Sequence, residues 1–184
     1  MAATRERILV AARALLVEHP AAFSLEAVAG KSGVARLTVY RHFASRAMLL
    51  RAVIATMSDL ARVSPRVQRA LRAEAPSDAV RQFVDVAWDV WRSEAPLIRA
   101  ALRLVNDPEI AEIVNATHRS RYRDSLRIAR KARSSLGAQD LARALALLTS
   151  PEAYLVMVDQ LELTPSQARH LLKRIAVGLL DEEE

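Results

Sequence analysis

Apolar side chains recur at the three- and four-residue spacing of α-helices along most of this chain. The first apolar stripe consists of Ile8, Leu9, Ala12, Leu15 and Leu16. The helix that carries it is expected to end near His19, because a residue that precedes proline is disfavoured in the α region. Alternating β-branched runs, which are typical of strands, are nearly absent. The pattern predicts an all-α protein of about nine helices.

Residues 24–51 contain the most informative pattern. Ser24 can cap a short helix, and Gly33 follows that helix at a position where a positive φ is favoured. Apolar residues then return at helical spacing, at Val34, Val39 and Phe43. The remaining face of this second helix is basic and aromatic, with Arg36, Leu37, Thr38, Tyr40 and Arg41. Two short helices joined by a glycine turn, with such an outer face on the second, are typical of a DNA-reading helix-turn-helix.

Capping residues and prolines divide the rest of the chain into longer helices. These helices are predicted over residues 45–63, 78–92, 94–105, 108–137, 140–150 and 165–180, with breaks at Ser64-Pro65, Pro76 and Ser150-Pro151. The helix over residues 78–92 is apolar nearly all round, which is typical of the centre of a bundle. We therefore expect an N-terminal three-helix module followed by a larger helical domain.

The composition and charge indicate a folded protein with a basic N-terminal part. The chain is 52% hydrophobic and 26% charged, which argues against disorder. Residues 1–62 contain nine Lys and Arg against four Asp and Glu, so they carry +5 of the net charge of +6. This excess coincides with the predicted helix-turn-helix, where it would attract the phosphates of DNA.

The same composition argues against an enzyme and against a bound cofactor. The chain has no cysteine, which excludes disulfides and cysteine-type zinc sites. The four histidines lack metal-ligand spacing, and there is no glycine-rich phosphate loop and no recognisable Ser/His/Asp arrangement. No apolar run reaches the roughly 18 residues that span a bilayer, and the N-terminus lacks a signal-peptide cleavage pattern. We expect a cytoplasmic protein with no metal and no cofactor.

Residues 5–53 resemble the TetR family of bacterial transcriptional regulators. The resemblance lies in the order RERILVAARALL, AFSLEAVAGKSGV and TVYRHFASRAMLL, and Tyr40-x-His42-Phe43 is its most specific part. It implies a helix-turn-helix DNA-binding domain over residues 1–52 and an effector-binding and dimerisation domain over residues 53–184. It further implies a homodimer, formed through the last two helices, that binds a palindromic operator and releases it when a small ligand binds.

The helical period assigns three residues of the second helix to base edges. With Val39 and Phe43 inward, 100° per residue places Leu37 and Arg41 outward, and Arg36 lies at the start of the helix. Arginine can contact guanine and leucine can pack on a thymine methyl group. The resemblance implies that phosphates are held by Thr38, Tyr40 and Arg46, with Lys31 and Ser24 as weaker candidates. The alternative is an ordinary solvated helix face.

The candidates for effector binding are aromatic and apolar residues of the predicted central helices. On sequence alone Trp88 and Trp91 are better explained as core, whereas the family resemblance makes a ligand pocket about equally reasonable. The same applies to Phe83, Leu104, His118, Tyr122, Tyr154 and Met157. A mostly apolar pocket would suit a hydrophobic or aromatic effector. The arginine-rich stretch from Arg119 to Arg133 is best explained as a solvated face, with an anionic effector as the alternative.

These observations predict a homodimeric transcriptional regulator, with a repressor favoured, whose helix at residues 45–63 transmits effector binding to the helix-turn-helix. One alternative is an architectural DNA-binding protein without an effector; the large aromatic-rich second domain argues against it. Another is a helical binding or dimerisation protein whose helix-turn-helix no longer binds DNA; the intact stretch from Thr38 to Phe43 argues against that.

Overall fold

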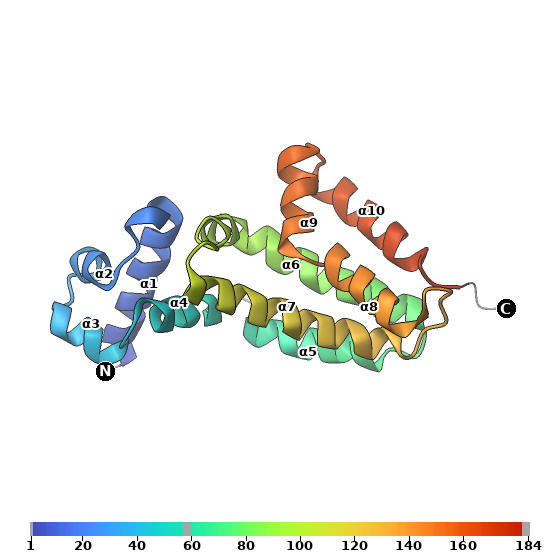
Figure 1. Cartoon of the computed structure of the whole chain (residues 1–184), viewed down its shortest axis with the longest axis horizontal. Coiled ribbons are helices and arrows are strands. Elements are labelled where there is room, and N and C mark those ends of the chain that lie inside the picture. The colour runs from blue at the N-terminus through green and yellow to red at the C-terminus, as the bar shows by residue number, and fades with distance from the viewer. Residues whose placement is uncertain (1, 57–59, 182–184) are drawn as a thin grey trace. The chain divides into compact units, whose positions relative to one another are not determined.

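A computed structural model describes residues 2–56 and 60–181, and these residues form ten α-helices and no β-strand. Figure 1 shows the helices, which are α1 (Ala2–Glu18), α2 (Leu25–Ser32), α3 (Arg36–His42), α4 (Arg46–Ala55), α5 (Leu60–Arg72), α6 (Pro76–Leu102), α7 (Pro108–Ala129), α8 (Gly137–Leu148), α9 (Pro151–Leu155) and α10 (Pro165–Val177). A 3₁₀ turn at Pro20–Ala22 and a π-helical turn at Val156–Gln160 complete the described elements. The all-α prediction is confirmed.

Packing divides the chain into two compact units. The first unit comprises Met1–Leu60 and Glu94–Asn115, and the second comprises Ala61–Ser93 and Ala116–Glu184. Helices α6 and α7 therefore each contribute one part to each unit. The division at residues 52 and 53 that the sequence suggested stays a prediction.

The helix starts follow the capping signals in the sequence. Ser24 and Ser45 accept hydrogen bonds from the third amide of α2 and α4, both at 3.1 Å. Ser150 does the same at the start of α9 at 3.0 Å. Thr164 and Gln167 form the predicted capping box at the start of α10. Each cap satisfies an amide that has no partner within its own helix.

The core of the first unit is built around α1. Its predicted stripe is confirmed, because Ile8, Leu9, Ala12, Leu15 and Leu16 are all buried. The helices α2 and α4 pack against α1 and contribute Val28, Leu49 and Leu50. An ion pair also lies in this unit: the carboxylate of Glu94, which is 0% exposed, binds the guanidinium of Arg13. A buried carboxylate needs such a cation, because desolvation penalises its charge.

In the second unit, charged side chains join α5 and α10 to α6. Arg169 on α10 donates to Asp85 on α6 at 2.6 Å, and Lys173 lies 2.6 Å from the same carboxylate. On the neighbouring turn of α6, Asp89 accepts from Arg66 on α5 at 2.7 Å. To the apolar core of the same unit, α6 contributes Val80, Phe83, Val84 and Trp88, which are all buried.

Two predicted helix breaks are wrong, because prolines lie inside helices. The break at Ser64-Pro65 falls within α5, and the predicted boundary between residues 92 and 94 falls within the 27-residue α6, which contains Pro96. A proline in a helix removes one backbone hydrogen bond. Apolar burial continues beyond both sites, at Val67 and Ala70 in α5 and at Leu97 and Ile98 in α6. This burial offsets the lost bond.

Two predicted helix ends are also wrong. The helix expected over residues 45–63 ends at Ala55 with Thr56 as its cap, and residues 57–59 lie outside the described part. The helix expected to reach Gly137 ends at Ala129. Beyond that end, Ser134 donates to the carbonyl of Leu179 at 2.6 Å, and Lys131 donates to the carbonyl of Leu71 at 2.5 Å. Tertiary hydrogen bonds thus hold residues 130–136 in a non-helical path.

Candidate nucleic-acid interface and ligand cavity

The turn between α2 and α3 depends on Gly33. Its φ is +63°, a left-handed conformation that side chains other than glycine rarely adopt. Arg7 on α1 donates to the carbonyl of Ser32 at 2.9 Å and so supports the turn from outside α2. Val34 and Val39 are buried beyond the turn. The short α3 is therefore held by its inner face, and its opposite face is directed outward.

The prediction that the Leu37 and Arg41 side chains of α3 face outward is confirmed. Leu37 is 65% exposed, and Arg36, Tyr40 and Arg41 are also exposed, whereas Val39 is completely buried. Thr38 is half-buried on the same helix. Of the candidates outside α3, Lys31 is exposed, and Ser24 and Arg46 are half-buried. A large apolar side chain as exposed as Leu37, set between cations, is well suited to contact a base edge.

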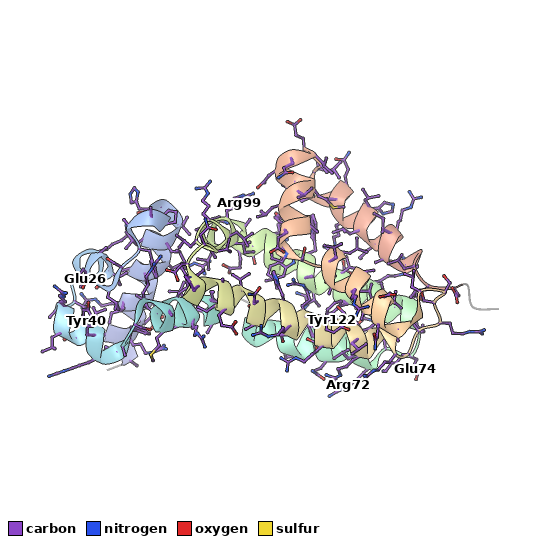
Figure 2. All side chains as sticks on the ribbon, viewed as in Figure 1. Glu26, Tyr40, Arg72, Glu74, Arg99 and Tyr122 are labelled. Carbon is purple, nitrogen blue, oxygen red and sulfur yellow. The ribbon has the colours of Figure 1, made fainter. Side chains whose placement is uncertain are left out.

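A carboxylate on α2 joins two of these exposed side chains. Glu26 Oε1 accepts a hydrogen bond from Arg36 Nη2 at 2.7 Å and another from the hydroxyl of Tyr40. Figure 2 shows Glu26 and Tyr40 beside each other on α2 and α3. The guanidinium of Arg36 also lies over the Tyr40 ring, 5.5 Å from its centroid. The hydrogen bond from Tyr40, with help from the backbone and from Arg36, lowers the pKa of Glu26 below its usual value. Arg36 and Tyr40 are thus held in one cluster on the outer surface.

Other candidate cations of the first unit also carry carboxylate partners. Lys31 Nζ lies 2.6 Å from Glu18, and its hydrogen bond lowers the pKa of that carboxyl. Arg46 Nη1 donates at 2.7 Å to Asp107, the residue that caps α7. Sequence reasoning missed Glu18, Glu26 and Asp107. Their spacing from the cations exceeds one helical turn, so no local pattern could have revealed the pairs.

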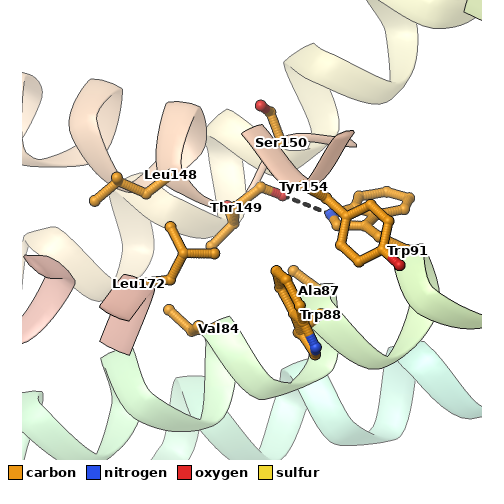
Figure 3. A pocket seen from close by; sticks show the side chains of 9 residues that line it. All are labelled: Val84, Ala87, Trp88, Trp91, Leu148, Thr149, Ser150, Tyr154 and Leu172. Carbon is orange, nitrogen blue, oxygen red and sulfur yellow. Dashed lines mark hydrogen bonds between the residues drawn. The ribbon is translucent and has the colours of Figure 1, made fainter. Parts of the chain in front are cut away.

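A second candidate site lies in the second unit, where three predicted aromatic residues converge. About 180 Å³ of empty space is lined by Val84, Ala87, Trp88, Trp91, Leu148, Thr149, Ser150, Tyr154 and Leu172 (Figure 3). None of this space is wide enough for a water molecule. The ring centroids of Trp88 and Tyr154 are 4.7 Å apart, and the Trp91 indole donates to the carbonyl of Thr149 at 2.9 Å. We call this space the aromatic cavity.

The other five predicted effector residues do not line the aromatic cavity. Phe83 is buried on α6, and Leu104 follows α6 in the part of the chain assigned to the first unit. Tyr122 on α7 and Met157 in the π-helical turn are half-buried. His118 on α7 lies 3.1 Å from the carboxylate of Glu152 on α9. The lining residues that sequence reasoning missed are Val84, Ala87, Leu148, Thr149, Ser150 and Leu172.

The described residues show neither a metal cluster nor a single membrane-spanning helix. Residues 2–56 and 60–181 contain no group of three or more His, Asp or Glu side chains arranged to hold a metal ion. No single helix in the described part is long and apolar enough to cross a membrane, although α8 and the bent segment Pro151–Gln160 meet that test as a pair.

Comparison with known proteins agrees with the architecture. Residues 8–53 match the family model described as bacterial regulatory proteins, tetR family. The HTH-type transcriptional repressor LfrR of Mycolicibacterium smegmatis is 34% identical over 112 residues, which are 59% of this chain and 56% of LfrR. The matched region thus spans little more than half of that relative.

Solved structures share the fold over nearly the whole chain. The SmeT–triclosan complex superposes with a TM-score of 0.78 at 20% identity, covering 98% of this chain and 93% of that one. NalD, the secondary repressor of the MexAB-OprM multidrug efflux pump in Pseudomonas aeruginosa, superposes with a TM-score of 0.72 at 20% identity and covers 98% of each chain. At these identities the similarity concerns the fold alone.

Proposed function

We propose that this chain belongs to the tetR family of bacterial regulatory proteins, whose model residues 8–53 match, and that it is a DNA-binding transcriptional repressor of the bacterial cytoplasm. The observation that carries the proposal is the outward face of α3, where Leu37 is 65% exposed beside Arg36 and Arg41. Arg36, Leu37 and Arg41 would contact base edges. The phosphates would be held by Thr38, Tyr40, Arg46, Lys31 and Ser24.

The carboxylate partners of these cations fit this function. Exposed ion pairs contribute little to stability, so phosphates can displace Glu26 from Arg36 and Glu18 from Lys31 at little cost. In the absence of DNA the same pairs reduce the positive charge of the face. They would thereby limit binding to arbitrary sequences, for which phosphate attraction supplies nearly all the affinity.

The aromatic cavity would bind a small hydrophobic or aromatic effector. Aromatic walls with few polar groups are typical of small-molecule sites. SmeT, which shares the fold, was solved in complex with triclosan. Because no part of the cavity is wide enough for water, an effector must displace side chains to enter. Release of DNA would follow if the opened state of the protein no longer matches the operator.

The test of DNA recognition is a selection of genomic fragments by the purified 184-residue chain. We expect enrichment of a palindrome that binds at least about 10³-fold more tightly than random DNA. The logarithm of its affinity should fall with the logarithm of salt concentration at a slope of about −0.9 per phosphate contact. A folded sample that enriches no sequence would contradict the proposal, and equal affinity for all DNA would favour the architectural alternative.

Replacing Glu26 by glutamine should raise affinity for random DNA by roughly threefold or more, because Arg36 then loses an exposed ion pair in each protomer. The control is Glu6→Gln, which makes the same charge change at an exposed residue of α1. Fluorescence anisotropy with a random duplex measures both variants. If Glu6→Gln raises the affinity as much, the effect reflects net charge and not the contact with Arg36 and Tyr40.

The proposed regulator acts as a homodimer through its C-terminal helices. Leu147 on α8 and Leu171 and Ile175 on α10 are apolar yet exposed, at 68%, 39% and 39%. Two copies of such a surface can bury each other around a twofold axis.

The double variant Leu171→Glu/Ile175→Glu should raise the dimer dissociation constant at least about tenfold, because two charges per protomer would enter the interface. Analytical ultracentrifugation measures this change. Leu161→Glu, at an exposed apolar residue outside α8 and α10, is the control, and a double variant as dimeric as this control would place the interface elsewhere.

A further inference from the structure

Arg121 on α7 holds its guanidinium in an unusual environment within the second unit. The group lies over the indole of Trp91, with its Cζ atom 5.9 Å from the ring centroid. Its Nε donates to the carbonyl of Ala146 on α8 at 3.1 Å. Its Nη1 is shielded from solvent and has no hydrogen-bond acceptor among the described residues. The Arg121 cation therefore lies beside the Trp91 ring, and the N–H groups at its Nη1 have no acceptor among the described residues.

The carboxylate that attracts Arg121 does not supply the missing acceptor. Glu152 attracts Arg121 electrostatically, but its carboxylate lies 3.1 Å from His118 Nε2. Burial outweighs this attraction and lowers the pKa of Arg121 below its usual value. A buried donor without an acceptor loses the hydrogen bonds that water would give it, and the loss is greater when the donor is charged. In native proteins such groups call for an acceptor of some kind, which a bound ligand can provide.

Trp91 connects this cation to the aromatic cavity, because its indole both contacts Arg121 and lines the cavity with Trp88 and Tyr154. A ligand with an aromatic ring in the cavity and a carboxylate beyond Trp91 would satisfy both environments. The ring would pack against the aromatic walls, and a carboxylate oxygen would accept from Nη1 in a charge-assisted hydrogen bond.

We propose that the effector of this protein is a compact aromatic carboxylate whose acid group binds Arg121 and whose ring occupies the aromatic cavity. This inference rests on the proposed function, because it names the chemical class of the ligand that releases the DNA. Because no part of the cavity is wide enough for a water molecule, the ring must displace side chains of the cavity wall, which favours a single ring over a large polycyclic molecule. Arginine is the appropriate residue, because it stays charged when partly buried and recognises planar carboxylates.

The experiment uses the intrinsic fluorescence of the 184-residue chain. The chain has two tryptophans, Trp88 and Trp91, and both line the aromatic cavity, so their emission reports directly on its occupancy. Titration with benzoate, phenylacetate and cinnamate should change this emission in a saturable way for at least one acid. The corresponding amide, which keeps the ring and removes the charge, should bind at least about tenfold more weakly. If none of the three acids changes the emission, or if the amide binds equally well, the inference is wrong.

Variants separate Arg121 from the general positive charge of α7. Arg121→Gln should weaken binding of the acid at least about tenfold, and Arg121→Lys should restore part of that loss. Arg123→Gln, at an exposed position on the same helix, should leave it unchanged. Equal loss in Arg121→Gln and Arg123→Gln would refute the assignment of Arg121, provided circular dichroism shows both variants folded.

A gel shift with the selected palindrome distinguishes this inference from the proposed function. If the wild-type chain binds no DNA sequence selectively, the proposed function fails whatever the fluorescence shows. If the chain binds its palindrome but the bound acid does not weaken that complex, the acid is not the effector and only the present inference fails. Release of the palindrome by the acid, lost in Arg121→Gln, is the expected result.

Discussion

Replacement of Tyr40 by alanine is expected to weaken operator binding at least about 10²-fold. A hydrogen bond to a charged group contributes about 1.5–3 kcal/mol, and a dimer loses one phosphate contact in each protomer. In the absence of DNA the Tyr40 hydroxyl donates to Glu26, so its hydrogen bond to a phosphate would replace an existing hydrogen bond. That bond is exposed and its replacement costs little. Fluorescence anisotropy with the selected palindrome measures the change in affinity.

Two further variants show which part of Tyr40 matters. Tyr40→Phe keeps the ring under Arg36 and removes the hydroxyl, so it should lose most of the affinity that Tyr40→Ala loses. Val10→Ala, which trims an exposed side chain of α1, should bind DNA like the wild type. Circular dichroism should show the same helical content in all three variants, because both residues are exposed. Unchanged affinity in Tyr40→Ala would contradict the assignment of Tyr40 to a phosphate.

Replacement of Arg13 by methionine is expected to lower the free energy of unfolding by about 3 kcal/mol, a decrease of roughly 10 °C in melting temperature. Methionine keeps an apolar stem and removes the cation that binds the fully buried carboxylate of Glu94. Removing one partner of a buried ion pair typically costs about 3–5 kcal/mol. The lower figure applies because the Arg13 side chain is 35% exposed.

A surface ion pair provides the matched control for Arg13. Arg143 donates to Asp140 at 2.5 Å on α8, and both side chains are 63% exposed. Arg143→Met should therefore lower the melting temperature much less than Arg13→Met does. Thermal unfolding followed by circular dichroism compares the two variants. If Arg13→Met is no less stable than Arg143→Met, the ion pair with Glu94 contributes no more than a surface contact.

Features that depend on neighbouring residues could be read from the sequence. The caps at Ser24, Ser45 and Thr164 act on amides three residues away, and the left-handed turn at Gly33 is a property of that residue and its backbone. The buried stripe of α1 and the outward direction of Leu37 follow from the helical period. Each of these interactions lies within one or two helical turns, where residue type and spacing are sufficient.

Features that depend on distant residues required the fold. Pro65 and Pro96 stay inside helices, and α7 ends at Ala129, because packing and hydrogen bonds with remote segments outweigh local preferences. Likewise, 61 residues separate Arg46 from the Asp107 that binds it. The aromatic cavity forms where α6 meets the start of α9, so Trp88 and Tyr154 come together although no local pattern relates them. Sequence spacing describes a helix face, whereas the partner of that face depends on how the helices pack.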